Sequence, residues 1–317
     1  MLELIPLMGV GSPISLLRAL PGSVAQGLIW GIMAIGVYIT FKILDFADLT
    51  VDGTLATGGA VAAMMILGGY PAGVAMLVAV IAGMLAGLIT GVLHTALGIP
   101  PILSGILTQL ALYSINMRIL GRANQAVSVD QFNLVLSSRY IIPAIITTAI
   151  IIVIMIGILY WFFGTEVGFT IRSTGCNENM TRAQGINTNV AKVLALVISN
   201  GLVGFAGGLY GQYQGFADVN MGRGAIVIGL AAVIIGQVLG EAIFGKRLNF
   251  FGRLLFVAIG GIIYYVVIQF VLWLGLDSND TKLFSATVVA IFLAVPYLQG
   301  KARNSYRRAA KGGKSEK

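Results

Sequence analysis

The stretch FADLTVDGTLATGGAVAAMMIL (residues 46–67) returns in outline as FADVNMGRGAIVIGLAAVIIGQ (residues 216–237). Both copies open with Phe-Ala-Asp, follow a long apolar run and lead into a short run rich in small residues. A long apolar run and then a final one follow each copy. Three shared residues alone can match by chance in so biased a composition. The matching order of the run lengths is what indicates an internal repeat.

The composition places the chain in a membrane. Of its 317 residues, 57% are hydrophobic and only 10% are charged, and the mean hydropathy is +0.92, whereas soluble domains carry about 25% charged residues. Apolar runs of about 20 residues, each long enough to cross a hydrocarbon core of about 30 Å, recur from end to end. Because a helix satisfies its own backbone in lipid, the chain is predicted to be an all-α polytopic membrane protein.

About nine spans are predicted, with four in each copy of the repeat and one between them. The predicted spans are 23–43, 53–68, 71–98, 101–119, 140–163, 190–216, 223–243, 249–275 and 281–299. An odd number of spans separates the two Phe-Ala-Asp segments, so the copies are expected to have opposite orientations. Such an inverted-topology repeat places a substrate route near its interface, around the bilayer midplane.

The predicted organisation has five parts. Residues 1–22 hold three prolines and several glycines and are predicted to be a broken, interfacial N-terminal segment without signal-peptide features. The first repeat half is 23–139, the linking span with its polar loop is 140–189, and the second half is 190–300. The tail, 301–317, is basic. Glycine stripes in the third and sixth spans predict tight helix packing within one subunit, or an interface between subunits.

The charges predict the orientation. The tail 301–317 holds seven basic residues and one glutamate, and positively charged segments stay on the cytoplasmic side, where they also attract anionic lipid. Counting spans backwards from the tail places 245–253 and 172–187 on the same side. The acidic stretch 274–280 then lies outside. No nucleic-acid role is inferred from the basic tail.

The sequence offers little chemistry. It holds one cysteine and one histidine, no metal-ligand cluster and no catalytic motif, so we predict neither an enzyme nor a bound cofactor. Few charges lie deep in the predicted spans, which argues against an ion-driven carrier. Neutral polar residues there either form interhelical hydrogen bonds or line a polar path. The candidate path residues are Asp52, Thr54, Gln109, Asn116, Asn200, Gln212 and Gln237.

One polar stretch, RSTGCNENMTRAQGIN (172–187), stands between two apolar blocks. Within it, Asn177 can cap a short helix, Glu178 follows at the positive end of the helix dipole, and Gly185 can end it. A short helix held by a span at each end can act as a rigid handle that a partner protein moves. We refer to residues 177–187 as the coupling segment.

The region 171–211 resembles bacterial ABC transporter permeases of the branched-chain amino acid and ribose type. The pattern of that family has an arginine, a glycine and an asparagine, then Ala-Arg-x-x-Gly-Ile-Asn, and then a glycine-rich span. The present chain matches this pattern with some departures. The matching positions are Arg172, Gly175, Asn177, Arg182, Gly185, Ile186 and Asn187. The stretch LDFADLTVDGTLATGGAVAA (44–63) is similar to a second conserved segment of the family.

This resemblance implies a BtuC-like (type II) importer permease fold in the bacterial cell membrane, nearest to single-permease systems for aromatic amino acids. It also implies a permease homodimer, an external substrate-binding lipoprotein, and two cytoplasmic ATPase subunits that hold ATP and Mg²⁺. The family's ATPase-contacting positions correspond to Asn177, Glu178, Asn179, Met180, Thr181, Arg182, Ala183, Gln184, Gly185, Ile186 and Asn187. Glu178 and Arg182 are expected to dock the ATPase, or else to be solvated loop charges or to contact lipid headgroups. A sugar or nucleoside permease of this family and a self-contained secondary carrier remain alternatives.

Overall fold

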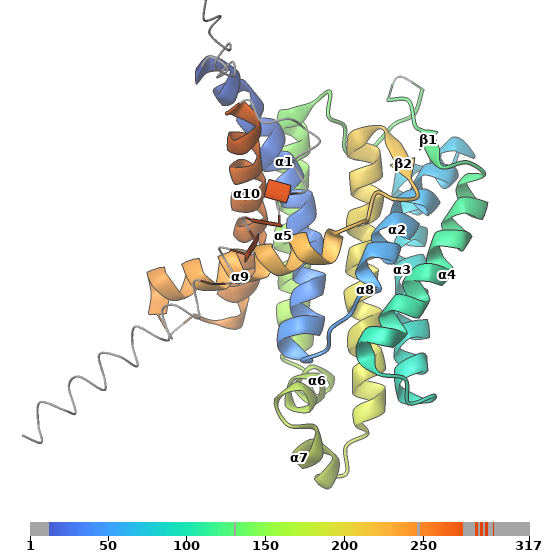
Figure 1. Cartoon of the computed structure of the whole chain (residues 1–317), viewed down its shortest axis with the longest axis vertical. Coiled ribbons are helices and arrows are strands. Elements are labelled where there is room, and N and C mark those ends of the chain that lie inside the picture. The colour runs from blue at the N-terminus through green and yellow to red at the C-terminus, as the bar shows by residue number, and fades with distance from the viewer. Residues whose placement is uncertain are drawn as a thin grey trace, which may run out of the picture.

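The computed structural model describes residues 13–129, 131–245, 248–274 and scattered positions between 283 and 294. The described chain is almost entirely helical, with one pair of three-residue strands (Figure 1). The helices are α1 (Pro13–Tyr38), the π-helix η1 (Ile39–Ile43), α2 (Val51–Leu67), α3 (Ala72–Thr95), α4 (Pro101–Leu120), α5 (Ile141–Phe163), α6 (Glu166–Cys176), α7 (Glu178–Ala183), α8 (Thr188–Gln214), α9 (Ala225–Phe244) and α10 (Phe250–Trp273). The strands β1 (Asn124–Ala126) and β2 (Phe216–Asp218) pair antiparallel.

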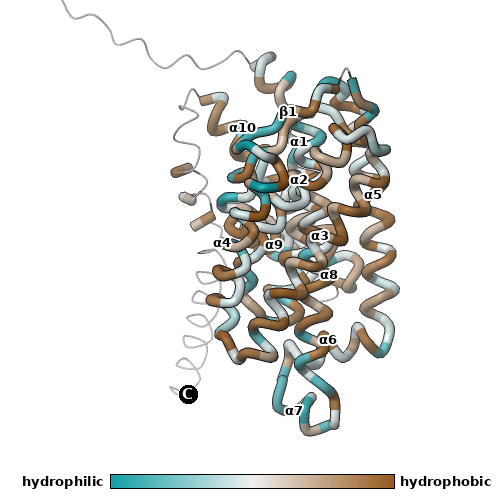
Figure 2. The backbone as a smooth tube through the Cα atoms, turned by 90° about the vertical axis from the view of Figure 1, so that its right-hand side faces the viewer, coloured by the Kyte–Doolittle hydropathy of each residue, from teal (hydrophilic) through white to brown (hydrophobic). Residues whose placement is uncertain are grey.

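The first eight predicted spans each coincide with a helix, and the ninth, 281–299, lies largely outside the described residues. Among the described helices, six are long and apolar enough to cross a membrane: α1 with η1, α3, α5, α8, α9 and α10. Helix α2 is apolar but only 17 residues long. Figure 2 shows hydrophobic residues along the upright helices and hydrophilic ones around α7. The chain is therefore a multi-pass membrane protein.

Helix α1 begins before the first predicted span, 23–43. It is helical from Pro13 and continues through Pro21 without interruption. Proline is tolerated in the first turn of a helix, where its missing N–H has no partner to lose. Inside a membrane helix, neighbouring groups can satisfy the carbonyl that a proline leaves free. Residues 1–12 lie outside the described part of the chain.

Long helices of the two predicted halves pack against each other. Helix α3, from the first half, packs along α8 of the second, and α10, from the second half, packs along α1 of the first. Helices α1, α5, α8 and α10 stand upright in Figure 1, whereas α9 crosses them obliquely from α2 toward α10. Helices α6 and α7 lie at one end of the bundle, and the β1–β2 pair lies at the other.

Glycines allow the closest of these contacts. A Cβ atom on Gly83 or Gly87 of α3 would overlap backbone oxygens of α8, and one on Gly204 of α8 would lie 2.7 Å from the Ala79 carbonyl oxygen. The glycine stripes of the third and sixth predicted spans thus face each other inside one subunit. This confirms the prediction of tight packing within the chain.

We expect Gly58→Ala to destabilise the fold by about 1–3 kcal/mol, because the new Cβ would overlap Gly204 across the α2–α8 contact. Thermal unfolding of the purified protein in detergent measures this. Gly157→Ala is the matched control, since Gly157 lies inside α5 with open space around its Cβ position. Equal melting temperatures for the two variants would contradict the packing described here.

Candidate functional site

The first turns of α2 and α9 meet inside the bundle. The Asp52 carboxylate, on α2, accepts hydrogen bonds from the backbone N–H groups of Gly224 (2.9 Å) and Ile226 (2.8 Å) at the start of α9. Gly222 packs so closely on Asp52 that a Cβ there would overlap the Asp52 carbonyl oxygen. Asp52 and Gly222 occupy the same position, the seventh, in the two copies 46–67 and 216–237.

The aspartates that open the two copies fold their chains alike. Asp48 Oδ1 accepts from the Thr50 N–H at 2.9 Å, and Asp218 Oδ1 accepts from the Asn220 N–H at 2.7 Å. Each is the turn that an aspartate forms with the backbone two residues later. The two copies therefore enter their short helices, α2 and α9, through the same local structure.

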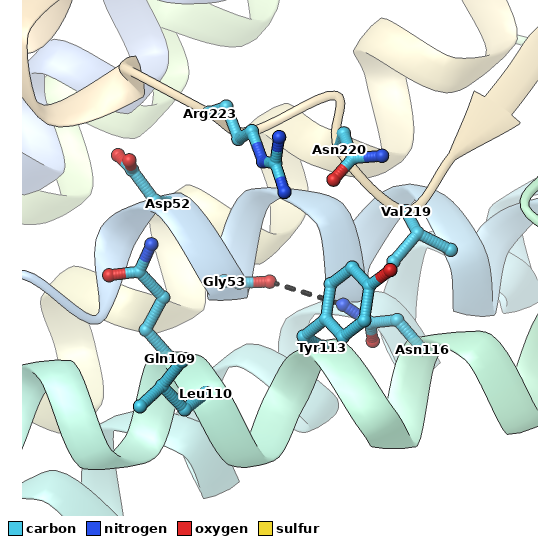
Figure 3. A pocket seen from close by; sticks show the side chains of 9 residues that line it. All are labelled: Asp52, Gly53, Gln109, Leu110, Tyr113, Asn116, Val219, Asn220 and Arg223. Atoms are coloured by element: carbon cyan, nitrogen blue, oxygen red, sulfur yellow. Dashed lines mark hydrogen bonds between the residues drawn. The ribbon is translucent and has the colours of Figure 1, made fainter.

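A polar pocket of about 290 Å³ opens beside this meeting point (Figure 3). Helix α2 forms one wall, α4 another, and the segment between β2 and α9 the third. Its lining residues are Asp52, Gly53, Gln109, Leu110, Tyr113, Asn116, Val219, Asn220 and Arg223. Three of the predicted path residues, Asp52, Gln109 and Asn116, are thus brought together from two helices. In Figure 3 the Arg223 side chain reaches into the space above Gln109 and Tyr113.

Two side chains in the pocket have hydrogen-bonding capacity to spare. The Asn116 amide donates to the Gly53 carbonyl at 3.5 Å, but its buried Oδ1 has no partner among the described residues. A buried polar atom without a partner is uncommon and calls for an explanation. The exposed Arg223 forms no ion pair with any residue that the structure describes. The Asn116 oxygen is enclosed by protein, so the group that the pocket presents to a ligand without a charged partner is the Arg223 guanidinium.

Arg223 also borders a second cavity, of about 360 Å³, between α1, α8 and α10. Aromatic rings dominate this cavity: Trp30 lies 5.3 Å from Tyr210 and 5.7 Å from Tyr265, measured between ring centroids. The amides of Gln26 and Gln269 line it too. Neither the aromatic rings of this cavity nor Arg223 was identified from the sequence. The rings of Trp30, Tyr210 and Tyr265 come from distant helices and belong to no motif.

The other predicted path residues lie elsewhere. Thr54 donates to Asn200 Oδ1 at 2.7 Å, and Asn200 donates to Asp48 Oδ2 at 2.7 Å in a buried network. Gln212 accepts from the Val135 N–H at 2.9 Å, and Gln237 lies half-buried on α9. Asp48 stands between two predicted spans, so its burial was not expected, yet it is only 1% exposed.

The polar stretch forms two short helices at the end of the bundle opposite the strands (Figure 1). Asn177 caps α7, with its Oδ1 accepting from the Met180 N–H at 3.0 Å. Gly185 adopts a left-handed conformation (φ +84°) just after the helix ends. Both features were predicted and are confirmed. Asn187 caps the next helix, α8, in the same way.

Glu178 ties α7 to α8. Its carboxylate lies 2.8 Å from Arg182 within α7 and 2.8 Å from Lys192 on α8. The hydrogen bond from Lys192 is the main reason that the pKa of Glu178 is lowered. The two predicted docking charges are therefore paired with each other. The exposed surface of α7 is formed by Asn179, Met180, Arg182 and Ala183, with Met180 60% exposed.

We expect Glu178→Gln to loosen α7, because it removes the charge that holds both Arg182 and Lys192. Hydrogen exchange of the amides of 178–183 should become several-fold faster at pH 7, while that of α8 beyond its first turns stays unchanged. Because the carboxyl pKa is lowered in the folded chain, its stabilisation is complete above the ordinary value of 4.5 and is lost as the pH falls below it. Unchanged exchange in the variant would show that these ion pairs do not hold α7.

A bundle of apolar helices around a polar pocket defines this chain as a membrane permease. It belongs to the family of permease components of branched-chain amino acid transport systems, whose family model matches residues 20–296. A tyrosine transport system permease of Clostridioides difficile (strain R20291) is 40% identical over 269 residues, covering 85% of this chain and 88% of that protein. The chain is therefore a permease component of ABC-type transport.

Two sugar permeases are more distant relatives. A fructose import permease of Bifidobacterium longum (strain NCC 2705) is 27% identical over 271 residues, covering 83% of this chain and 74% of that protein. A galactofuranose transporter permease of Escherichia coli (strain K12) is 28% identical over 292 residues, covering 90% and 79%. No solved structure matches the chain.

Proposed function

We propose that this chain is the membrane subunit of an ATP-driven importer that moves an amino acid, preferably an aromatic one, delivered by an external binding protein. The observation that carries the proposal is the pocket between α2 and α4, lined by the Gln109 amide on α4 and by the Arg223 guanidinium. An amino acid presents a carboxylate and an ammonium group on one carbon. Arg223 can bind the carboxylate, and the Gln109 side-chain oxygen can accept from the ammonium.

The aromatic cavity favours an aromatic side chain. It adjoins the same Arg223, and its Trp30, Tyr210 and Tyr265 rings offer edges and faces for stacking. The relative that transports tyrosine is 40% identical, whereas the two sugar permeases are 27–28% identical. A sugar importer is the second candidate, because the pocket amides and the Tyr113 hydroxyl could also bind hydroxyl groups.

Transport by alternating access fits an inverted repeat of two four-span halves, nine spans in all. Three observations support this arrangement. The repeat-related residues Asp52 and Gly222 touch, as residues near a two-fold axis do. Asp48 and Asp218 make the same turn, and each half packs its third helix against the first helix of the other. Rocking of the halves about this contact would open the pocket to each side in turn.

The driving force is expected to come from partner subunits. The pocket holds a single carboxylate, Asp52, which is already committed to the start of α9. We propose that two cytoplasmic ATPases, which carry the ATP and Mg²⁺, dock on the coupling segments of two copies of this chain. The coupling segment and the C-terminus then lie in the cytoplasm. Helix α6 transmits the movement, since Gly175 packs directly against Ile43 of η1.

We expect Arg223→Gln to reduce tyrosine uptake by about 10–100-fold, because a hydrogen bond to a charged group contributes about 1.5–3 kcal/mol. The measurement is uptake of labelled tyrosine by cells that carry the permease with its ATPase and binding protein. Arg122→Gln, an exposed arginine near β1, is the control. Labelled fructose is tested in parallel. Uptake of fructose but not tyrosine by the unaltered protein would replace the amino-acid proposal with the sugar one.

A further inference from the structure

A further cavity, of about 280 Å³, lies at the α6 end of the molecule, away from the pocket beside Asp52. It is enclosed by the end of α1 with η1, by α6, and by the start of α10. Its lining residues are Tyr38, Lys42, Ile43, Arg172, Cys176, Leu248, Phe250 and Arg253. Three of these carry a positive charge and none carries a negative one. We call this cavity the cationic pocket.

The cations are held in place. Arg172 lies 5.3 Å from the centre of the Phe250 ring and 5.7 Å from that of Phe169, so aromatic faces fix its guanidinium. Arg253 donates to the Leu248 carbonyl at 3.4 Å. Among the described residues, none of these three cations forms an ion pair within 4.0 Å.

Helix α10 adds a further positive contribution to the cationic pocket. The helix begins at Phe250, and the preceding Asn249 makes no side-chain cap to its first N–H groups. The start of a helix attracts anions through these free N–H groups and the helix dipole. Three side-chain cations, a tyrosine hydroxyl and this helix start thus surround one cavity. This combination suits a phosphate group, whose oxygens accept several hydrogen bonds at once.

Exposed aromatic residues indicate where such a phosphate would come from. Tyr160 and Trp161, at the end of α5, are 53% and 71% exposed, and the Tyr160 ring lies 6.2 Å from that of Phe251 at the start of α10. Exposed tyrosine and tryptophan at the ends of membrane helices mark the level of lipid headgroups. We propose that the cationic pocket binds the phosphate of an anionic phospholipid at the membrane surface.

A lipid bound there would connect the energy-coupling region to the bundle. The cationic pocket is shared by η1 and α10, which come from different halves, and by α6, which continues directly into α7. A phosphate held by Lys42, Arg172 and Arg253 would bring these three elements into one unit. Transport would then depend on the anionic lipid content of the membrane, independently of which solute occupies the pocket beside Asp52.

The test is mass spectrometry of the intact full-length protein in detergent, titrated with phosphatidylglycerol or with phosphatidylcholine. The double variant Lys42→Gln/Arg253→Gln should bind phosphatidylglycerol about 25-fold more weakly, at about fivefold for each cation removed. Both residues are exposed, so the variant is expected to fold; its melting temperature checks this. Arg118→Gln/Arg122→Gln removes the same charge from the opposite end of the molecule and should bind like the unaltered protein.

Inorganic phosphate is titrated in a separate arm. If it binds the unaltered protein but not the double variant, and phosphatidylglycerol shows no preference over phosphatidylcholine, the phosphate chemistry stands and its source is soluble. The proposal would be overturned if Lys42→Gln/Arg253→Gln and Arg118→Gln/Arg122→Gln bound phosphatidylglycerol equally well and also bound inorganic phosphate equally well. So would a defect of the Lys42→Gln/Arg253→Gln variant that is confined to ATPase copurification, since the cations would then serve a protein contact.

Discussion

Replacing Met180 by glutamate is expected to abolish solute uptake, with a loss of at least about 30-fold, while the protein still inserts and folds. Met180 is 60% exposed on α7 and holds no part of the bundle together. In the proposed importer it faces the ATPase. Loss of a central interface residue costs about 2 kcal/mol or more, and a buried unpaired charge adds to that.

The measurement combines uptake by cells with copurification of the ATPase on the permease. Tyr140→Glu is the matched control for ATPase binding, because Tyr140 is 61% exposed and begins α5 at the other end of the bundle. That variant should retain its ATPase. Normal uptake and normal ATPase binding by Met180→Glu would show that α7 is not where the driving force enters.

Asp52→Asn should cost about 2–3 kcal/mol of folding stability and most of the transport activity. In the unaltered protein the N–H groups of Gly224 and Ile226 donate to the Asp52 carboxylate. The substitution removes this negative charge from the start of α9 and places an amide NH₂ group, which is a donor, next to those N–H groups. Because Asp52 stands on α2, this loss weakens the contact between the two halves of the molecule. Thermal unfolding in detergent and tyrosine uptake report the two effects.

Asp45→Asn is the control for this substitution. Asp45 is exposed in the segment before α2 and adopts a positive φ of 57°, which asparagine also tolerates. It should melt and transport like the unaltered protein. If Asp52→Asn behaved in the same way, the meeting of α2 and α9 would not depend on this carboxylate.

Local chemistry explains which parts of the structure could be predicted. The ends of α7 follow from Asn177 and Gly185, because helix caps depend on residues within a few positions of each other. The facing of α3 and α8 follows from glycines at helical spacing, such as Gly83 and Gly87. Apolar run length located the helices for the same reason, since hydrophobic thickness is a property of each segment alone.

The full lining of the pockets could not be predicted, because it depends on where distant segments meet. Arg223 stands at the predicted start of a span, and only the fold brings it beside Gln109 and Tyr113 of α4. Asp48 is buried by Asn200, a partner 152 residues away. Lys42 and Arg253 likewise become neighbours only through the packing of α1 against α10.

The role of the charges in the coupling segment could not be predicted from the sequence either. Glu178 and Arg182 were expected to dock a partner, and their types and spacing also suit a pair within one helix. The structure pairs them and adds Lys192 from α8. Which of the two roles a charge serves depends on where α8 begins, and that is set by the Asn187 cap. The exposed Met180, which carries no charge, is the better candidate for a partner contact.

Tyrosine accumulation in liposomes that contain the purified chain tests the central claim most directly. The liposomes are prepared with and without the ATPase, with the binding protein on the opposite face, and with or without ATP on the ATPase side. We predict accumulation only when the ATPase, the binding protein and ATP are all present. Accumulation by the chain alone, driven by a proton or sodium gradient, would contradict the account and identify a self-contained carrier.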